Sequence, residues 1–229
     1  DDPLRYGKKT IHEQHNVAVA INAGDLLIGE GYRLIAESGL PPEMVVDCIR
    51  VIANGHRSMA LGQGSELLTT SGKRILPMPE ILEIFRNKTA SAFRVSLLLG
   101  GIIGGAGART LDQLERFSHF TGIAYQAMDD LEDFSGNRGD IRSRKPSILL
   151  TMLMDSLTDV ERRIMEQAYT SGDFDVIYQR LERHQTVSHV SAFIQDQLIR
   201  ARESLSELEN LGLKLALHEI LGKIFNRYI

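Results

Sequence analysis

The sequence predicts an all-α protein, and three observations carry that prediction. Apolar residues recur at spacings of three and four along most of the chain, the periodicity of helices with one buried face. Proline is scarce, at 6 of 229 residues, and alternating runs of β-branched residues are hard to find. With 43% hydrophobic residues the chain is large enough for one substantial core, so we interpret residues 1–229 as a single helical domain.

Helix boundaries follow from this periodicity and from local start and stop signals. The Pro41–Pro42 pair marks a break. Thr158 with Glu161, and Thr110 with Gln113, have the spacing of a capping box, in which two side chains satisfy backbone amides of the first turn. The predicted helices span residues 17–38, 42–69, 79–103, 110–135, 147–155, 158–170, 173–184, 186–209 and 211–227.

Composition argues against several classes of protein. The net charge of −4 gives no reason to expect nucleic acid as a partner. The most apolar run, residues 95–108, is too short to cross a membrane, and its five glycines are expected to end a helix and admit a neighbouring backbone. The single cysteine, Cys48, excludes an intrachain disulfide and fits a reducing cytoplasm.

The most informative segment is residues 122–133, an apolar run that ends in four acidic groups within five residues. On a helix, Asp129 and Asp133 lie one above the other and Asp130 lies about 100° around. These carboxylates repel one another unless a cation joins them. Carboxylate oxygens in this arrangement suit Mg²⁺, which completes its shell with water and substrate phosphate. For this motif alone, an acidic solvated helix end is the alternative.

The sign of the charge reverses a few residues later. The segment 137–147 holds Arg138, Arg142, Arg144 and Lys145, while Gly136 and Gly139 indicate a loop and Pro146 can open the next helix. Metal-bound carboxylates followed by basic side chains are what a diphosphate needs, because the cations neutralise its remaining charge. An ordinary charged surface loop is the alternative.

Two further polar pieces interrupt apolar helical segments. Lys88 and Thr89 stand within residues 81–95, and Gly62-Gln63 precedes Glu66 in another segment. A Lys–Thr pair in a helix can offer an ammonium and a hydroxyl to one anion. Taken alone the pair is weak evidence, since a solvated lysine explains it as well.

Taken together, and in their order along the chain, these motifs resemble those of the trans-isoprenyl (polyprenyl) diphosphate synthases. The family patterns are roughly L-R-R-G-x-P-T-x-H, G-Q-x-x-D-L, K-T, F-Q-x-x-D-D-x-x-D and G-K-x-T. The matching pieces here begin at Arg5, Gly62, Lys88, Tyr125 and Lys145, and they are collinear over residues 4 to about 150. Their joint order is much more specific than any single motif.

The resemblance implies a fold and a reaction. The fold is a helical bundle around a central cavity, with two aspartate-rich motifs at its mouth. In the reaction, Mg²⁺ ions hold an allylic diphosphate, which ionises and is attacked by isopentenyl diphosphate to give a longer trans-polyprenyl diphosphate. It also implies a homodimer, with the glycine-containing helix 18–38 at the subunit interface.

Site residues follow from the same resemblance, motif by motif. Asp129, Asp130 and Asp133 correspond to the second aspartate-rich motif and are the expected metal ligands, Asp129 foremost. The expected catalytic residues are Lys88, Thr89, Gln126 and Lys145. The expected diphosphate-binding residues are Arg5, Lys8, Lys88, Gln126, Arg138 and Lys145.

The departures from the family pattern also matter. Tyr6 stands where a second arginine binds isopentenyl diphosphate, and Lys8 or Lys9 is expected to restore part of that charge. Glu66 replaces an aspartate, and Arg138 is the nearest substitute for the missing L-G-K. The first aspartate-rich motif lies upstream of this element in the family, so we expect the chain to lack its N-terminal helices. Asp1 and Asp2 are assigned no metal.

Two other functions stay open. A non-catalytic subunit of a heteromeric prenyl synthase fits Tyr6 and the absent first motif, but the retained aspartates, Lys88, Gln126 and Lys145 oppose it. A class I terpene cyclase shares the helical fold and Mg²⁺ and needs no isopentenyl diphosphate. The R-x-G-x-x-T-x-H, G-Q and K-T elements favour the synthase.

Overall fold

The structure confirms the all-α prediction. The computed structural model describes residues 3–72, 74–136 and 138–228, so Asp1, Asp2 and Asn137 lie outside the described residues. Contacts divide the chain into two compact units, Asp1–Ile52 and Ala53–Ile229, and the boundary falls within a long helix, α3 (Pro42–Gly72). The interpretation of residues 1–229 as one domain stays a prediction.

The N-terminal unit begins with a small antiparallel hairpin, β1 (Leu4–Arg5) and β2 (Lys8–Lys9). Its two-residue turn has positive φ at both Tyr6 (51°) and Gly7 (74°), which is the backbone of a type I′ hairpin turn. Two helices follow, α1 (Ile11–Gln14) and α2 (Val17–Ala36), and the Asn16 side chain caps α2 by accepting from the Val19 amide at 2.9 Å.

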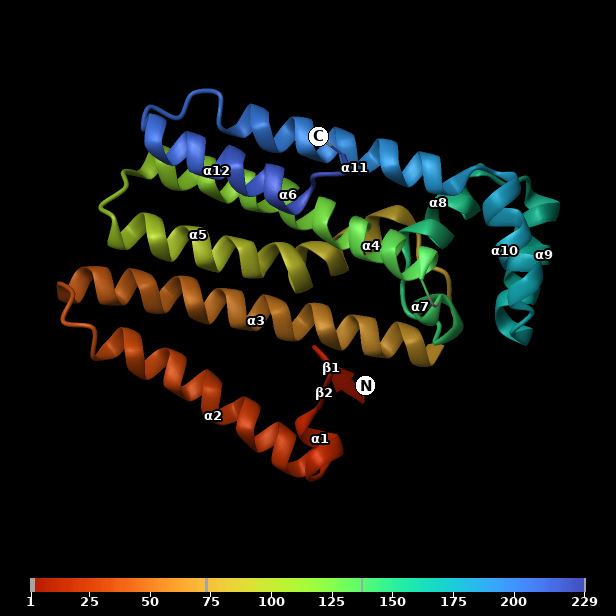
Figure 1. Cartoon of the computed structure of the whole chain (residues 1–229), viewed down its shortest axis with the longest axis horizontal. Coiled ribbons are helices and arrows are strands. Elements are labelled where there is room, and N and C mark those ends of the chain that lie inside the picture. Colours follow the sequence, from red (N-terminus) through yellow and green to blue (C-terminus); the bar gives the residue numbers. More distant parts are fainter. Residues whose placement is uncertain (1–2, 73, 137, 229) are drawn as a thin grey trace. The chain divides into compact units, whose positions relative to one another are not determined.

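The C-terminal unit is built around a layer of long helices. Figure 1 shows α5 (Ser91–Ile103), α6 (Ala108–Ser135) and α11 (Thr186–Ser204) side by side, with α6 in the middle. The other elements of this unit are α4 (Met78–Phe85), the π-turn η1 (Arg86–Ala90), α7 (Gly139–Arg142), α8 (Ile148–Ser156), α9 (Asp159–Ser171), α10 (Phe174–Arg183) and α12 (Leu211–Ile224).

Helix α6 is the centre of this unit because it is packed on several sides. Leu114, Phe117 and Ala124 are buried along it, and Ile194 and Leu198 are buried on the facing α11. A helix packed on several sides has no wide polar face, which explains why its sequence lacks a single clean apolar stripe. Its last turns, which carry Asp129 to Asp133, are therefore held in a rigid frame.

Every predicted helix is present, with differences at the ends and in one interior. The predicted helix 79–103 is divided by the π-turn, and the predicted helix 186–209 ends at Ser204. The Thr158–Glu161 capping box is confirmed. The Thr110 capping box is wrong, because α6 already begins at Ala108 with Gly107 as its N-cap; the tight glycine turn after α5 brings the helix start forward.

The loop after the acidic motif also differs from its prediction. It contains a short helix, α7, and Pro146 does not open α8, because Ser147 is the N-cap and Ile148 the first helical residue. The prediction that the glycine-rich run ends a helix is confirmed, since α5 ends at Ile103 and Gly105 has φ +73°. None of the helices in the described ranges combines the length and hydrophobicity that a membrane crossing requires.

Candidate diphosphate and metal site

The π-turn carries the Lys88–Thr89 pair, and two glycines make room for it. A Cβ on Gly122 of α6 would lie 2.3 Å from the Ala90 Cα, and one on Gly62 of α3 would lie 2.5 Å from the Lys88 nitrogen. Neither separation is possible for real atoms, so both neighbouring backbones approach the turn only because these residues lack side chains. Single π-turns inside helices occur frequently at functional sites.

The residues of three separate motifs meet at this turn. Lys88 Nζ donates to Glu66 Oε2 at 2.6 Å, and Thr89 Oγ1 donates to Gln126 Oε1 at 2.5 Å. The Gln126 amide nitrogen in turn donates to Asp129 Oδ2 at 3.4 Å. Lys88 is a third exposed and Glu66 is mostly buried, so a charged pair faces the solvent beside a hydroxyl, an amide and a carboxylate. Such a set can hold an anion through the ammonium and a cation through the carboxylate.

Asp130 has a different environment from its neighbours. It is 5% exposed, and its Oδ2 accepts from the Ile148 amide at 2.8 Å, which is the first residue of α8. Burial raises the pKa of this carboxyl to about 8, although the bonds from Ile148 and Gln126 lower it in part. The side chain therefore ties α6 to the start of α8 and points away from the solvent, where we expected a metal ligand.

Asp129 and Asp133 stay near the surface, and a third carboxylate, Asp140, lies close to both. Asp133 Oδ2 accepts from the Asp140 amide at 3.0 Å, and Lys145 Nζ lies 2.5 Å from Asp140 Oδ1. Partial burial raises the pKa of Asp129, the charge of Asp140 raises it further, and Lys88 opposes both. Asp140 was not predicted from the sequence, because basic residues dominate its segment. Only the short helix α7 brings it back to the acidic motif.

These side chains fit Mg²⁺ as partial ligands. Asp129 and Asp133 stand one turn apart on α6, and Mg²⁺ is commonly held by one or two carboxylates with the rest of its shell from water and phosphate. The raised pKa of Asp129 also indicates a carboxylate that a cation would stabilise. Within the described ranges, no three His, Cys, Asp or Glu side chains converge as a complete site.

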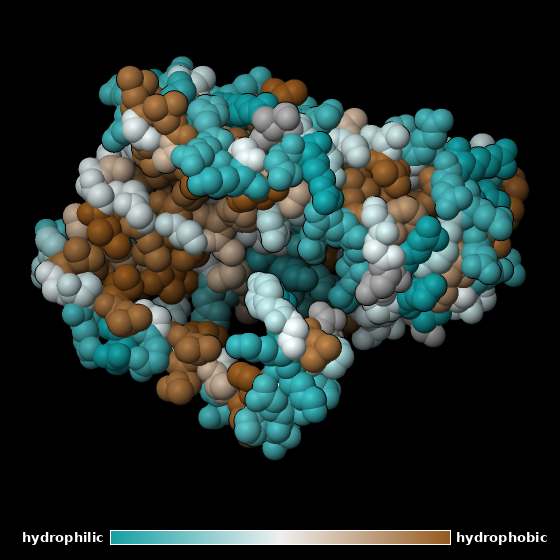
Figure 2. Space-filling view, in the orientation of Figure 1, coloured by the Kyte–Doolittle hydropathy of each residue, from teal (hydrophilic) through white to brown (hydrophobic). Residues whose placement is uncertain are grey.

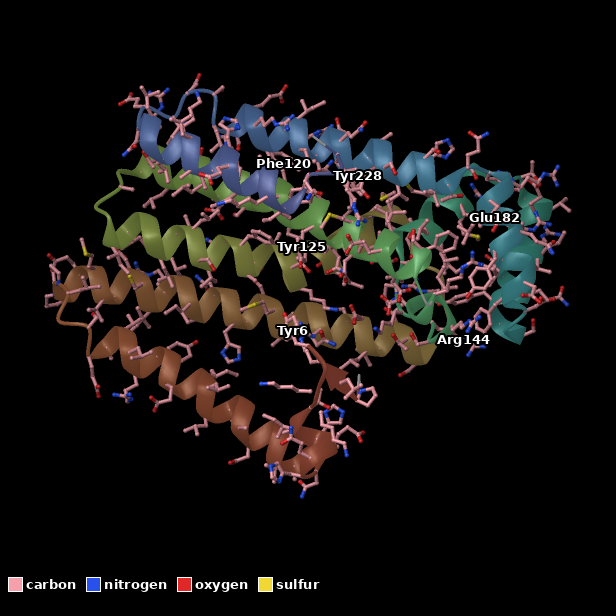
Figure 3. The ribbon with its side chains drawn as sticks, viewed as in Figure 1. Tyr6, Phe120, Tyr125, Arg144, Glu182 and Tyr228 are labelled. Atoms are coloured by element: carbon pink, nitrogen blue, oxygen red, sulfur yellow. The ribbon has the colours of Figure 1, made fainter. Side chains whose placement is uncertain are left out.

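Arg138 and Arg144 do not lie in the acidic cluster. The Arg138 guanidinium lies over the rings of Phe134 (4.9 Å) and Tyr178 (4.5 Å) and 3.8 Å from Glu182 of α10. Arg144 donates to the carbonyls of Tyr169 and Thr170 on α9. Figure 3 labels Arg144 and Glu182 in this part of the chain. These contacts fasten the loop to α9 and α10, so the expected diphosphate role of Arg138 requires its side chain to turn.

Arg5 and Lys8 belong to the hairpin of the N-terminal unit. They are paired across it, and the Arg5 guanidinium lies 5.6 Å from the centre of the Tyr6 ring. Tyr6 is 92% exposed at the tip of the turn and is labelled in Figure 3. Their roles toward a diphosphate stay predictions.

An apolar groove lies along α5 and α6, and Phe93 at its edge is four residues, or one helical turn, beyond Thr89. The Phe93 ring contacts the ring of Tyr125 on α6, which is labelled in Figure 3, with centroids 5.7 Å apart. Farther along lies a cavity of about 360 Å³, which is almost wholly apolar and is lined by Phe93, Leu97, Phe117, Leu217 and Ile220. Figure 2 shows hydrophobic surface gathered along α5 on this face. A polar, charged end and an apolar extension suit a molecule with a charged head and a hydrocarbon tail.

Comparison with known proteins agrees with these features. The family model described as polyprenyl synthetase matches residues 1–181. The chain belongs to the polyprenyl synthetase family. The resemblance of its motifs to the trans-isoprenyl diphosphate synthases is thereby confirmed.

Individual relatives place the chain within that family. It is 36% identical over 141 residues to a farnesyl diphosphate synthase of Geobacillus stearothermophilus, covering 59% of this chain and 47% of that protein. Among solved structures, a geranylgeranyl pyrophosphate synthetase from Pyrococcus horikoshii aligns with a TM-score of 0.85 at 25% identity, over 97% of this chain and 71% of that one. A decaprenyl diphosphate synthase from Rhodobacter capsulatus has the same fold, with a TM-score of 0.87 at 22% identity, over 100% of this chain and 72% of that one. The chain thus spans about half the length of several curated relatives.

Proposed function

We propose that the full-length protein is a Mg²⁺-dependent trans-prenyltransferase, which condenses an allylic diphosphate with isopentenyl diphosphate and releases diphosphate. The single observation that carries the proposal is the polar network at the π-turn, where three separate motifs meet. Lys88 is paired there with Glu66, and Thr89 is linked through Gln126 to Asp129. Family membership and the names of the relatives support the same chemistry.

In this proposal each group of residues has one task. Asp129 and Asp133 would hold Mg²⁺, which supplies positive charge against the departing diphosphate. Lys88 and Lys145 add charge to the same phosphates once they leave Glu66 and Asp140, and Thr89 and Gln126 orient them by hydrogen bonds. Asp130 acts through Ile148, because it fixes the start of α8 and so the position of Lys145.

The apolar groove would serve the hydrocarbon part of the substrate. Phe93 and Leu97 line it, and Tyr125 contacts the Phe93 ring. These side chains would keep water from the allylic cation that ionisation creates. Arg5 and Lys8 are proposed to bind isopentenyl diphosphate, with Tyr6 giving a weaker contact than the arginine of the family pattern.

A homodimer belongs to the same proposal. None of the described residues of helix α2 is buried, although the helix is rich in apolar side chains. Five of these side chains are more than half exposed: Val17, Ile21, Leu26, Leu27 and Leu34. An apolar helix of this kind is stabilised by a covering surface, and a second copy fits the resemblance; the mass measured by sedimentation equilibrium tests it. A cytoplasmic location is proposed from the single, buried Cys48, and cell fractionation tests it.

The deciding experiment is a turnover assay. The full-length protein is incubated with Mg²⁺, labelled isopentenyl diphosphate and either dimethylallyl, geranyl or farnesyl diphosphate. We expect longer prenyl diphosphates, and Asp129→Asn should lower kcat/KM by roughly a hundredfold or more, as the loss of a charge-stabilising group does in other enzymes. Asp155→Asn, which removes an exposed carboxylate on α8, is the matched control.

The other outcomes identify the other functions. A hydrocarbon or alcohol formed without isopentenyl diphosphate would indicate a terpene cyclase. Turnover that requires a second protein would indicate a non-catalytic subunit. Either result overturns the proposed function.

A further inference from the structure

A second cavity lies on the other side of the π-turn from the polar network. Its volume is about 540 Å³, and all of its lining residues belong to the C-terminal unit. The π-turn contributes Arg86, Asn87 and Ala90 to this cavity, whereas Lys88 and Thr89 contact Glu66 and Gln126. The charged and aromatic side chains that line it include Arg57, Arg86, Arg94, Arg116, His119 and Phe120.

The charge of this cavity is opposite to that of the chain. Four arginines and one carboxylate, Glu115, line it, while the whole protein carries a net charge of −4. Arg94 is paired with Glu115 at 2.6 Å, and Arg116 with Asp112 at 3.0 Å. The two pairs leave the positive charge of the other two arginines uncompensated.

Those two arginines are Arg57 of α3 and Arg86 of the π-turn. Throughout the part of the chain that the structure describes, neither guanidinium has a hydrogen-bond or ion-pair partner. Guanidinium groups from separate elements around one hollow repel one another, and an anion between them removes that cost. Their planar donors match phosphate oxygens in bidentate geometry.

The positive charge of Arg86 also acts on His119, which lines the same cavity. Burial lowers the pKa of its imidazole, and the positive charge of Arg86 lowers it further. The ring is therefore close enough to respond to Arg86 and is neutral at pH 7, when it can donate one hydrogen bond and accept another. Beside it, Phe120 offers an aromatic ring at a centroid distance of 5.1 Å.

We propose that this cavity binds a small phosphorylated molecule, with Arg57 and Arg86 as its phosphate ligands. The volume lies within the range of small-molecule sites and is too small for a peptide domain or a nucleic-acid duplex. The Asn54 and Asn87 amides and Phe120 supply contacts for a non-phosphate part of the ligand. The site is separate from the proposed diphosphate and metal site and does not depend on the proposed function.

The test is a binding titration of the full-length protein in EDTA, which removes metal-dependent binding at the acidic motif. The probes are inorganic pyrophosphate and ADP, so that one arm offers only phosphate and the other adds an aromatic ring. The double variant Arg57→Gln/Arg86→Gln should bind both probes at least tenfold more weakly than the wild type. Arg163→Gln, an exposed arginine on α9, is the matched control for the loss of a surface charge and should bind as the wild type does.

A variant at the other site separates the two locations. Lys88→Met is expected to weaken only binding at the diphosphate and metal site, so adding Arg57→Gln/Arg86→Gln to it should still lower the affinity for the probes at least tenfold. If Lys88→Met loses binding while the double arginine variant retains it, the probes bind at the diphosphate and metal site and the inference is overturned. Binding that is equal in all variants, or absent from the wild type, overturns it as well.

Nuclear magnetic resonance gives a local readout. The His119 Hε1 signal, assigned by its loss in His119→Gln, should shift on addition of pyrophosphate in EDTA, and its apparent pKa should rise as an anion offsets the charge of Arg86. An unchanged His119 signal at saturating probe would overturn the inference.

Discussion

The two sides of the π-turn differ in how their polar groups are partnered. On one side Lys88 and Thr89 are bonded to Glu66 and Gln126, and on the other Arg86 faces a cavity with no partner among the described residues. Neighbouring positions on a helix diverge by about 100°, so five successive residues supply both sides. A paired cation is positioned for an exchange of partners, whereas an unpaired cation is free to bind a ligand directly.

The largest expected effect that tests this difference comes from Lys88→Met. Removal of a charge-assisted phosphate contact costs roughly 1.5–3 kcal/mol, so kcat/KM for the allylic diphosphate should fall about ten- to a hundredfold. Steady-state kinetics with varied allylic substrate measure it, and Arg163→Gln serves as the control. A Lys88→Met variant with wild-type kcat/KM would show that the paired side is not the diphosphate side.

Part of the fall in kcat/KM in Lys88→Met would come from Glu66 and not from the lost phosphate contact. The variant leaves the Glu66 carboxylate mostly buried without its cation, which destabilises the fold. The double variant Lys88→Met/Glu66→Gln separates the two contributions. If the double variant recovers stability but not activity, Lys88 acts on the substrate. Recovery of both would mean that the pair is only structural.

The next effect concerns the close approach that holds the turn in place. Gly122→Ala forces a Cβ against the Ala90 backbone and should destabilise the protein by about 1–3 kcal/mol, as overpacking does. Gly64→Ala is the matched control, because its Cβ meets no described atom within 4 Å and helix propensity favours alanine by about 0.5–1 kcal/mol. Urea denaturation measures both, and opposite signs are expected; equal stabilities would contradict the glycine contact.

The last effect is a pH dependence at Asp130, which is measured as a slope of unfolding free energy against pH. Burial raises its pKa from an ordinary value of 3.8 to about 8, so the folded protein retains a proton that the unfolded chain releases above about pH 4. The contribution of this group to stability therefore falls as pH rises from about 4 to 8, by at most about 1.4 kcal/mol per pH unit. In EDTA, Asp130→Asn should flatten the slope of unfolding free energy against pH.

That variant preserves the anchor while it removes the titration. In Asp130→Asn, the amide oxygen of the new side chain still accepts from the Ile148 amide, as the protonated carboxyl does. If wild type and variant have parallel profiles between pH 5 and 8, Asp130 is ionised in the folded protein. A carboxylate open to metal would then be the better description of it.

Most of the helices and their order could be predicted because they depend on local pattern. The apolar spacing of α9 and α10, and the capping box at Thr158, are properties of neighbouring residues, so the sequence contained them. Lys88, Thr89, Gln126 and Asp129 were also singled out in advance, from the joint order of their motifs. Position along the chain, however, could not tell which of them share a hydrogen bond.

By itself, therefore, the sequence determined the helical class, the motif order and the family, because helix periodicity and motif spacing are one-dimensional. Only the tertiary structure decided that Asp130 faces inward to Ile148 while Asp129 remains at the surface, since this depends on where α8 begins relative to α6. It also decided the π-turn and the arginine cavity behind it. Those depend on Gly62 and Gly122, whose missing side chains let three distant segments meet, and the free energy of that packing is absent from any local pattern.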